Sequence, residues 1–258
     1  MIEIALCLAI IGFALVSIML VLPGGMNTQR ETREETIVNQ DASMLLESVR
    51  NSARGLDDLT NNVYAITNYA ADYNVQGQLG LRHTAGYTRT AASINNASAN
   101  GWVITNGLRI IGLLSTPEYT TGFPNGLPIA DTLGRNYTSN HIVAWVRSFS
   151  GLAAEKPPQD NQIMQENTFS YRVACVNAPL ATDNFSITNS SYTRQLAGNL
   201  RELRMLFMWP QLPNGNVGKF RQTFRASVGG QLIQTNDFSA NPAMPLYFYQ
   251  SQSFTNAP

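Results

Sequence analysis

The feature that most constrains this chain is an uncharged apolar run near its start. The nineteen residues from Ile4 to Leu22 contain no Asp, Glu, Lys or Arg, and Glu3 stands directly before them. As an α-helix this run is about 29 Å long at about 1.5 Å per residue, close to the roughly 30 Å thickness of a hydrocarbon core. A carboxylate at a bilayer centre costs about 2.5 to 3.5 kcal/mol, so Glu3 needs a compensating partner.

We interpret the run as a membrane-length helix and not as a secretory signal peptide. A signal peptide has a basic segment before a shorter apolar core and ends at a small-residue cleavage site. Here no Lys or Arg precedes the run, and Pro23, Gly24 and Gly25 are followed by more helix-forming sequence. These three residues weaken the middle of the helix, because proline lacks a backbone donor and glycine favours the unfolded chain.

The sequence after the glycines predicts an amphipathic helix. NTQRETREETIVNQDASMLLESVRNSARG places opposite charges three and four residues apart, and Gly55 is a suitable helix end. Its apolar stripe is formed by Ile37, Leu45, Val49 and Ala53. Residues 1–55 therefore predict one very long helix, apolar all round in its first half and amphipathic in its second.

This arrangement resembles the type IV pilin and type II secretion pseudopilin superfamily. MIEIALCLAIIGFALVSIMLVLPGGMN is similar in particular to the pilin-like proteins of Verrucomicrobia and their relatives, and LRELRMLFMWPQLPNGNVGKFRQTFRASVGG to the C-terminal signature of that group. The two stretches cover about a quarter of the chain. The resemblance implies an α+β fold: a long helix of residues 1–55, with residues 1–26 as the membrane and filament-core segment, packed on an antiparallel β-rich head domain of residues 56–258.

The resemblance also implies a function, that of a structural subunit of an extracellular type IV pilus-like filament. Such a subunit is anchored in the inner membrane before assembly, and its partners are copies of itself, a prepilin peptidase and the pilus assembly machinery. Glu3 and Met1 would be the self-assembly residues, since in the family this carboxylate pairs with the terminal ammonium of a neighbouring subunit in a dry core. The alternative is that Glu3 lies at the membrane interface and has no partner.

The position of Glu3 departs from the family pattern. In the family the glutamate stands four residues after the processed N-terminus, whereas Glu3 stands two residues after Met1. Either two mature residues and a basic leader precede Met1 in the precursor, or cleavage falls at an unusual place.

Other functions stay open at this level. The chain also fits a pseudopilin of a type II secretion system, or a minor pilin or adhesin. Exposed aromatic side chains at Tyr247, Phe248 and Tyr249 would favour an adhesin, although they suit a final core strand equally well. No enzyme is expected, because His83 and His141 have no partners at metal-ligand spacing and no nucleophile or phosphate-binding motif occurs. We therefore predict no catalytic residue, no metal and no cofactor.

Composition argues against a nucleic acid partner. The formal net charge is zero and only 13% of residues are charged, so the chain as a whole has no basic field.

Cys7 lies in the apolar run and Cys175 far along the chain, and no intrachain disulfide is expected. N-x-S/T triplets, which chance explains in so Asn- and Ser-rich a chain, begin at Asn96, Asn136, Asn184 and Asn189.

The rest of the chain predicts short elements. Residues 56–73 have near-helical apolar spacing and predict a short helix that Asp57 or Asp58 caps. WVITNGLRIIGLLS and HIVAWVRSFSG fit strands or helices, and Pro157-Pro158 marks an exposed turn or joint.

The C-terminal third predicts strands. FSYRVACVNAPL predicts one strand, and LRELRMLFMWP and FRQTFRASVGG predict a hairpin around Asn214-Gly215. The residues expected on one strand face, toward the long helix, are Leu203, Met205, Phe207 and Trp209.

Overall fold

The computed structural model describes residues 2–52, 56–73, 78–88, 102–120, 137–150, 169–180, 196, 198–212, 214–237, 244–250 and 253–254. The chain divides into two compact units, Met1–Gln40 and Asp41–Pro258. The helices are α1 (Ile2–Arg50), α2 (Leu59–Asn62) and α4 (Gly107–Leu114). The strands are β1 (Val63–Tyr73), β2 (Leu79–Thr88), β3 (Trp102–Val103), β4 (Tyr119–Thr120), β5 (Tyr137–Arg147), β6 (Ser170–Pro179), β7 (Leu200–Gln211), β8 (Val217–Gly229), β9 (Gln231–Asp237) and β10 (Met244–Gln250).

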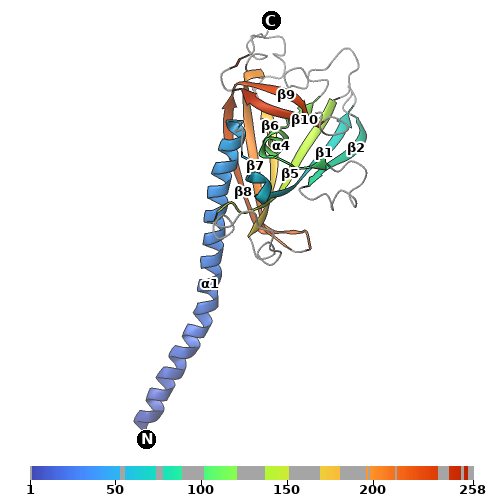
Figure 1. Ribbon diagram of the computed structural model, residues 1–258. Helices are drawn as coiled ribbons and strands as arrows, with labels where there is room; N and C mark the ends of the chain where they lie inside the picture. The colour runs from blue at the N-terminus through green and yellow to red at the C-terminus, as the bar shows by residue number, and fades with distance from the viewer. Residues whose placement is uncertain are drawn as a thin grey trace. The chain divides into compact units, whose positions relative to one another are not determined.

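The predicted long N-terminal helix is present, and a sheet domain follows it (Figure 1). Helix α1 ends at Arg50, before the expected stop at Gly55, and Ser52 takes a left-handed backbone conformation with φ of 46°. The Ser52 Oγ accepts a 2.6 Å hydrogen bond from the Tyr249 backbone N–H. This bond to a distant strand fixes the chain just beyond the helix end.

The main sheet has its strands in the order β3-β2-β1-β5-β6-β7-β8, with β4 paired to β5 (Figure 1). Its pairs are antiparallel except for the short pairing of β2 with β3. Strands β9 and β10 form a second, two-stranded antiparallel sheet. The α+β layout expected from the sequence, a long helix followed by an antiparallel sheet domain, is thus observed.

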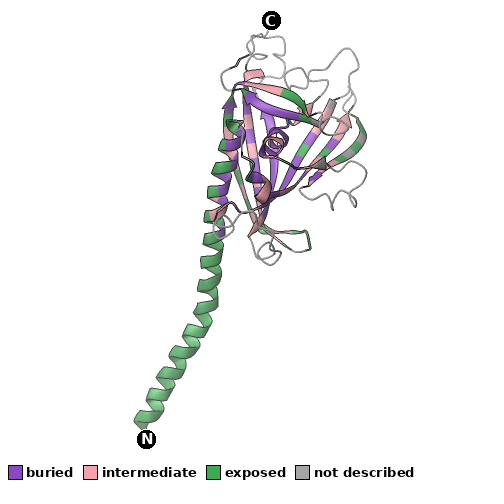
Figure 2. Ribbon diagram, viewed as in Figure 1, coloured by how far each residue is buried: buried purple, intermediate pink, exposed green. Residues whose placement is uncertain are grey.

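The predicted C-terminal hairpin is confirmed. Strands β7 and β8 pair along most of their length, and the turn contains Gly215 at φ of 80°, a conformation that suits glycine. The expected face of β7 is buried, and its residues are Leu203, Met205, Phe207 and Trp209. Register places Val173 of β6 opposite Phe207, so Tyr171 lies on the same face. We call this buried side of the sheet the inner face (Figure 2).

The helix expected over residues 56–73 is wrong for most of its length. Only Leu59–Asn62 is helical, and residues 63–73 form strand β1 between β2 and β5. A register shift between Val63 and Ala65 inserts an extra residue, so that Val63 and Ile66 are both buried although they are three residues apart. This bulge imitates helical spacing in the sequence.

Asp57 also differs from its expected role. The α2 N-cap residue, Asp58, makes no side-chain capping bond, and the Asp57 Oδ1 instead accepts a 3.0 Å hydrogen bond from the Gly107 N–H at the start of α4. Asn106 accepts from the Arg109 N–H at 2.9 Å in the same first turn. A carboxylate fifty residues earlier in the chain thus caps α4, which the sequence had left undecided between helix and strand.

Helix α4 and strand β10 complete the core. Most residues of α4 are buried, and the helix contacts β1, β5 and β10. Tyr247, Phe248 and Tyr249 of β10 are buried, so the interpretation as a final core strand is correct and the exposed-aromatic interpretation is wrong.

Gly107→Ala should destabilise the sheet domain, because a Cβ there would clash with the Leu56 carbonyl oxygen. We expect the unfolding free energy to fall by about 1 to 3 kcal/mol or more, measured by chemical denaturation. Gly86→Ala is the matched control, since a Cβ at Gly86 meets nothing within 4 Å. Equal effects of the two substitutions would contradict this account of Gly107.

Candidate assembly segment

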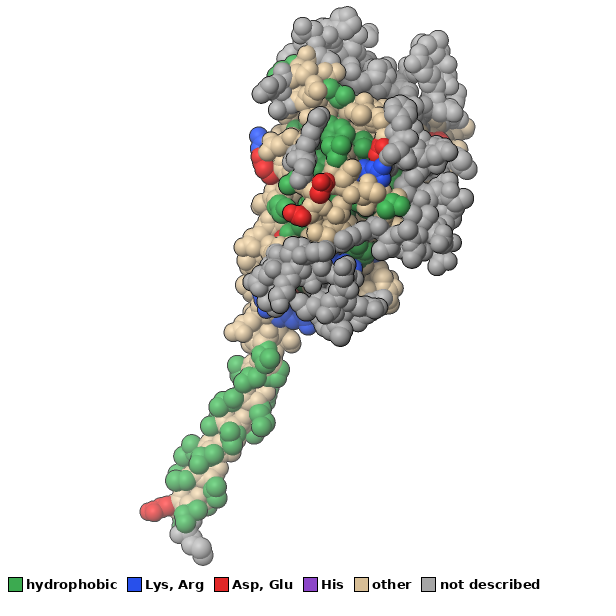
Figure 3. Space-filling model, viewed as in Figure 1, with side chains coloured by type: hydrophobic (Ala, Val, Ile, Leu, Met, Phe, Trp, Pro, Cys, Tyr) green, Lys and Arg blue, Asp and Glu red, His purple; other side chains and the backbone are tan. Residues whose placement is uncertain are grey.

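The N-terminal half of α1 exposes its apolar side chains. Phe13 is 78% exposed and Leu20 76% exposed, and large apolar residues from Ile2 to Met26 are exposed around the helix (Figures 2 and 3). By length and composition the helix is able to cross a membrane. Water is a poor solvent for such a cylinder, so this segment belongs in lipid or against other apolar surfaces.

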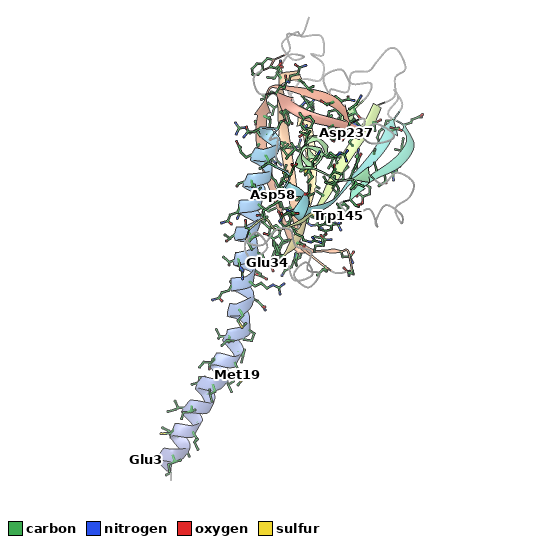
Figure 4. All side chains as sticks on the ribbon, viewed as in Figure 1. Glu3, Met19, Glu34, Asp58, Trp145 and Asp237 are labelled. Carbon is green, nitrogen blue, oxygen red and sulfur yellow. The ribbon has the colours of Figure 1, made fainter. Side chains whose placement is uncertain are left out.

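Glu3 lies in the first turn of this helix and is exposed (Figure 4). A negative charge at a helix N-terminus interacts favourably with the helix dipole. Among residues 2–29 no Lys or Arg is available to neutralise it. Met1, the second residue expected to act in self-assembly, lies outside the described residues.

Pro23, Gly24 and Gly25 lie inside α1, which is continuous through them in the single chain. Proline has no N–H to donate to the carbonyl of Met19, four residues earlier. A Cβ added at Gly24 or Gly25 would meet nothing within 4 Å. Within a single chain, an alanine would therefore fit at either position without a steric clash. Because helix propensity is lowest at these residues, the sequence predicts a break in the assembled state: between about residue 14 and residue 26 the backbone should be partly non-helical when subunits pack together. This stays a prediction.

The end of α1 belongs to the sheet domain, and Asp41 anchors it there. The Asp41 carboxylate accepts hydrogen bonds from the Tyr171 hydroxyl at 2.9 Å, the Ser150 hydroxyl at 2.7 Å and the Phe149 backbone N–H at 3.1 Å. Asp41 is 1% exposed, and Ala42, Leu45 and Val49 are buried on the following turns. The last turns of the helix are therefore held by apolar burial and by one buried carboxylate.

The candidate residues predicted from the sequence did not include Asp41. Its position four residues before Leu45 and eight before Val49 places an acid on the apolar stripe of the predicted helix. An acid on such a stripe signals a buried hydrogen-bonded carboxylate, since charged groups are seldom buried without partners. Its three partners lie in segments that only the tertiary structure brings together.

Burial raises the pKa of the Asp41 carboxyl above its ordinary value of 3.8, because loss of solvent outweighs the hydrogen bonds from Ser150, Tyr171 and Phe149. The folded chain therefore binds this proton more tightly than the unfolded chain. Between the two pKa values the folded state carries more protons, so the contribution of Asp41 to the unfolding free energy falls as pH rises above 3.8.

Asp41→Asn should remove this pH dependence while it keeps the size of the side chain and one acceptor oxygen. We expect the stability of the variant, relative to the original chain, to increase as pH rises from about 4 to about 7. Chemical denaturation at a series of pH values measures the difference. Asp58→Asn, at an exposed position, is the control. A constant difference between Asp41→Asn and the original chain across this range would contradict the prediction.

The other residues that the sequence singled out belong to several different elements. His141 is exposed on β5, and His83 belongs to β2. Within the described ranges, no three His, Cys, Asp or Glu residues are placed to hold a metal ion. Cys7 and Cys175 are free thiols, and burial raises the pKa of Cys175 to about 12. The four N-x-S/T asparagines and Pro157-Pro158 lie outside the described residues.

The chain matches no protein-family model, no curated protein and no solved structure.

Proposed function

We propose that the chain is a structural subunit of an extracellular, type IV pilus-like filament that polymerises through its N-terminal helix. The observation that carries this proposal is an exposed apolar helix of membrane length with one carboxylate in its first turn, joined to a folded sheet domain. Before assembly the apolar segment lies in the inner membrane. In the filament it lies against copies of itself.

Apolar burial drives the proposed assembly. At roughly 25 cal/mol per Å² of apolar area, a few hundred Å² buried per helix contact outweighs one imperfect ion pair. Contacts between different surfaces of successive subunits generate a helical filament when their rotation does not close into a ring. The exposed cylinder from Ile4 to Leu22 is the surface that such contacts bury.

In this proposal Glu3 pairs with the terminal ammonium of a neighbouring subunit. A buried carboxylate is tolerated when an opposite charge lies close, and leaving it unpaired in a low-dielectric core is costly. The pairing also selects the axial offset between helices, because only one offset brings the two charges together. The role of Glu3 is then to position subunits as well as to reduce the cost of burying its charge.

Glu3→Ala should leave the chain folded and inserted while it slows or abolishes addition to the filament. Glu3→Gln should share the defect, because it keeps shape and hydrogen bonding but removes the charge. The measurement is the amount of sheared filament relative to membrane-held subunit, at equal subunit levels. Yields equal to the original chain from both variants would reduce Glu3 to an interfacial residue.

Gly24→Ala combined with Gly25→Ala tests the predicted break in the assembled helix. Both sites are open, so we expect the substitutions to stabilise the single-chain helix by about 0.5 to 1 kcal/mol each. If packed subunits need an extended stretch here, filament yield should nevertheless fall. Gly12→Ala, also at an open site but far from Pro23, is the control. A filament map with unbroken helix through Pro23 would contradict the break.

The same observations fit a pseudopilin of a type II secretion system, whose assembly stays short. Sheared surface material separates the two functions, since a filament subunit should be its main protein. The sequence argument for an adhesin required exposed side chains at Tyr247, Phe248 and Tyr249, and these residues are buried.

A further inference from the structure

The side of the main sheet opposite the inner face carries a concentration of basic side chains. Strand alternation and register place Arg172 opposite Met208, Met208 opposite Arg221, and Arg204 opposite Arg225. Lys219 alternates with Arg221 on β8, and Lys219, Arg221 and Arg225 are exposed. We call this surface the basic face and define it by Arg172, Arg204, Lys219, Arg221 and Arg225.

Acidic side chains do not balance the basic face. Among the described residues that β5 to β8 place on this side, Glu202 is the one carboxylate, and it lies 3.3 Å from the Arg204 Nε and 3.7 Å from the Arg225 Nη1. Arg204 and Arg225 are direct cross-strand neighbours of like charge, an arrangement that destabilises a sheet when nothing compensates it. One glutamate compensates these two arginines incompletely and, among the described residues, forms no ion pair with Arg172, Lys219 or Arg221.

The guanidinium groups are also incompletely hydrogen-bonded. The Nε atoms of Arg172 and Arg204 are buried and have no hydrogen-bond partner, although the latter lies near Glu202. The Arg172 Nη2 donates a 2.6 Å bond to the Gly215 carbonyl, which holds its side chain across the end of the hairpin. These Nε atoms are enclosed by protein, so the positive charge that the face presents to a ligand is mainly that of the exposed side chains Lys219, Arg221 and Arg225.

We propose that the basic face binds an acidic polysaccharide. Guanidinium groups bind carboxylate and sulfate groups through charge-assisted hydrogen bonds, and their planar geometry favours oxyanions. Thr223 and Ser227 are exposed between and beside the arginines of β8, where their hydroxyls suit the neutral hydroxyls of a sugar chain. This assignment goes beyond filament assembly and does not rest on it.

The aromatic residues of this side favour a polysaccharide over a nucleic acid. Binding of single-stranded nucleic acid combines basic groups with aromatic rings that are free to stack on bases. Here the Arg172 guanidinium covers the ring of Trp145 at 5.1 Å, and that of Arg147 covers the ring of Tyr64 at 4.9 Å (Trp145 is labelled in Figure 4). These two rings, which lie next to the arginines, are covered, whereas Tyr69 of β1, 47% exposed on the same side, is separated from β6 by β5. On β6 to β8, charge and hydroxyl contacts remain as the basis of recognition.

The test measures binding of the full chain, in detergent, to polygalacturonate, with neutral dextran as a blank and oligo-dT as the nucleic acid probe. We expect binding to polygalacturonate that weakens as salt is added, and none to dextran. Arg221→Gln combined with Arg225→Gln should lower the affinity about tenfold or more, since two charge-assisted contacts are lost. Both side chains are exposed, so the sheet should stay folded.

The matched control removes the same net charge elsewhere, through Arg30→Gln and Arg50→Gln on α1. This control should bind polygalacturonate as tightly as the original chain. The proposal is overturned by absence of binding, by an equal loss in the control, or by tighter binding to oligo-dT. Filament yield is measured in parallel and should be unchanged in the β8 variant. A lower filament yield from the Arg221→Gln, Arg225→Gln variant would assign the basic face to contacts between subunits and would also overturn the proposal. This outcome does not depend on the filament yield of the Glu3 variants.

Discussion

Alternation along β7 forces Leu203, Met205, Phe207 and Trp209 onto one side of the sheet, and this side must be removed from water for the domain to be stable. The last turns of α1, helix α4 and strand β10 provide buried apolar residues of the same domain. Asp41, a charged residue drawn into this core, accepts three hydrogen bonds there, whereas the Nε and Nη1 atoms of the buried Arg201 have no hydrogen-bond partner. The buried carboxylate gives the helix end a defined position that apolar contact alone would leave free to slide.

The sheet domain and the apolar helix differ in how their apolar side chains are removed from water. The domain buries its apolar residues within one chain, whereas the side chains from Ile4 to Leu22 remain exposed in the single chain. A segment of this kind is stable in lipid or in a bundle of copies, and a filament subunit needs both environments in succession. The pilin-like proposal is attractive because it explains the apolar length, the single carboxylate and the independent head together.

The net charge of the chain does not describe how its charged side chains are distributed over the sheet. A formal net charge of zero argues against any long-range attraction of polyanions. The strands nevertheless segregate the charges, because period-two alternation on β8 sends Lys219, Arg221 and Arg225 to one side and Phe220 and Phe224 to the other. Binding at short range depends on this local density, so a neutral chain still has a surface suited to an acidic polymer.

Local signals in the sequence were sufficient to predict the N-terminal helix, strand β6 and the hairpin around Asn214-Gly215. Exposure of residues 4–22 also follows from their unbroken apolar character. Features that depend on distant partners were set by the tertiary structure. Residues 63–73 form a strand because β2 and β5 pair with them. The bulge in β1 spaces its buried residues as in a helix, so the sequence pattern predicted a helix there. In the same way Asp57 caps α4, Asp41 accepts three hydrogen bonds, and the basic face assembles from three strands, β6, β7 and β8. A periodic pattern reports which side of an element is apolar, but register and long-range hydrogen bonds depend on which segments meet, and one chain's local composition does not encode that choice.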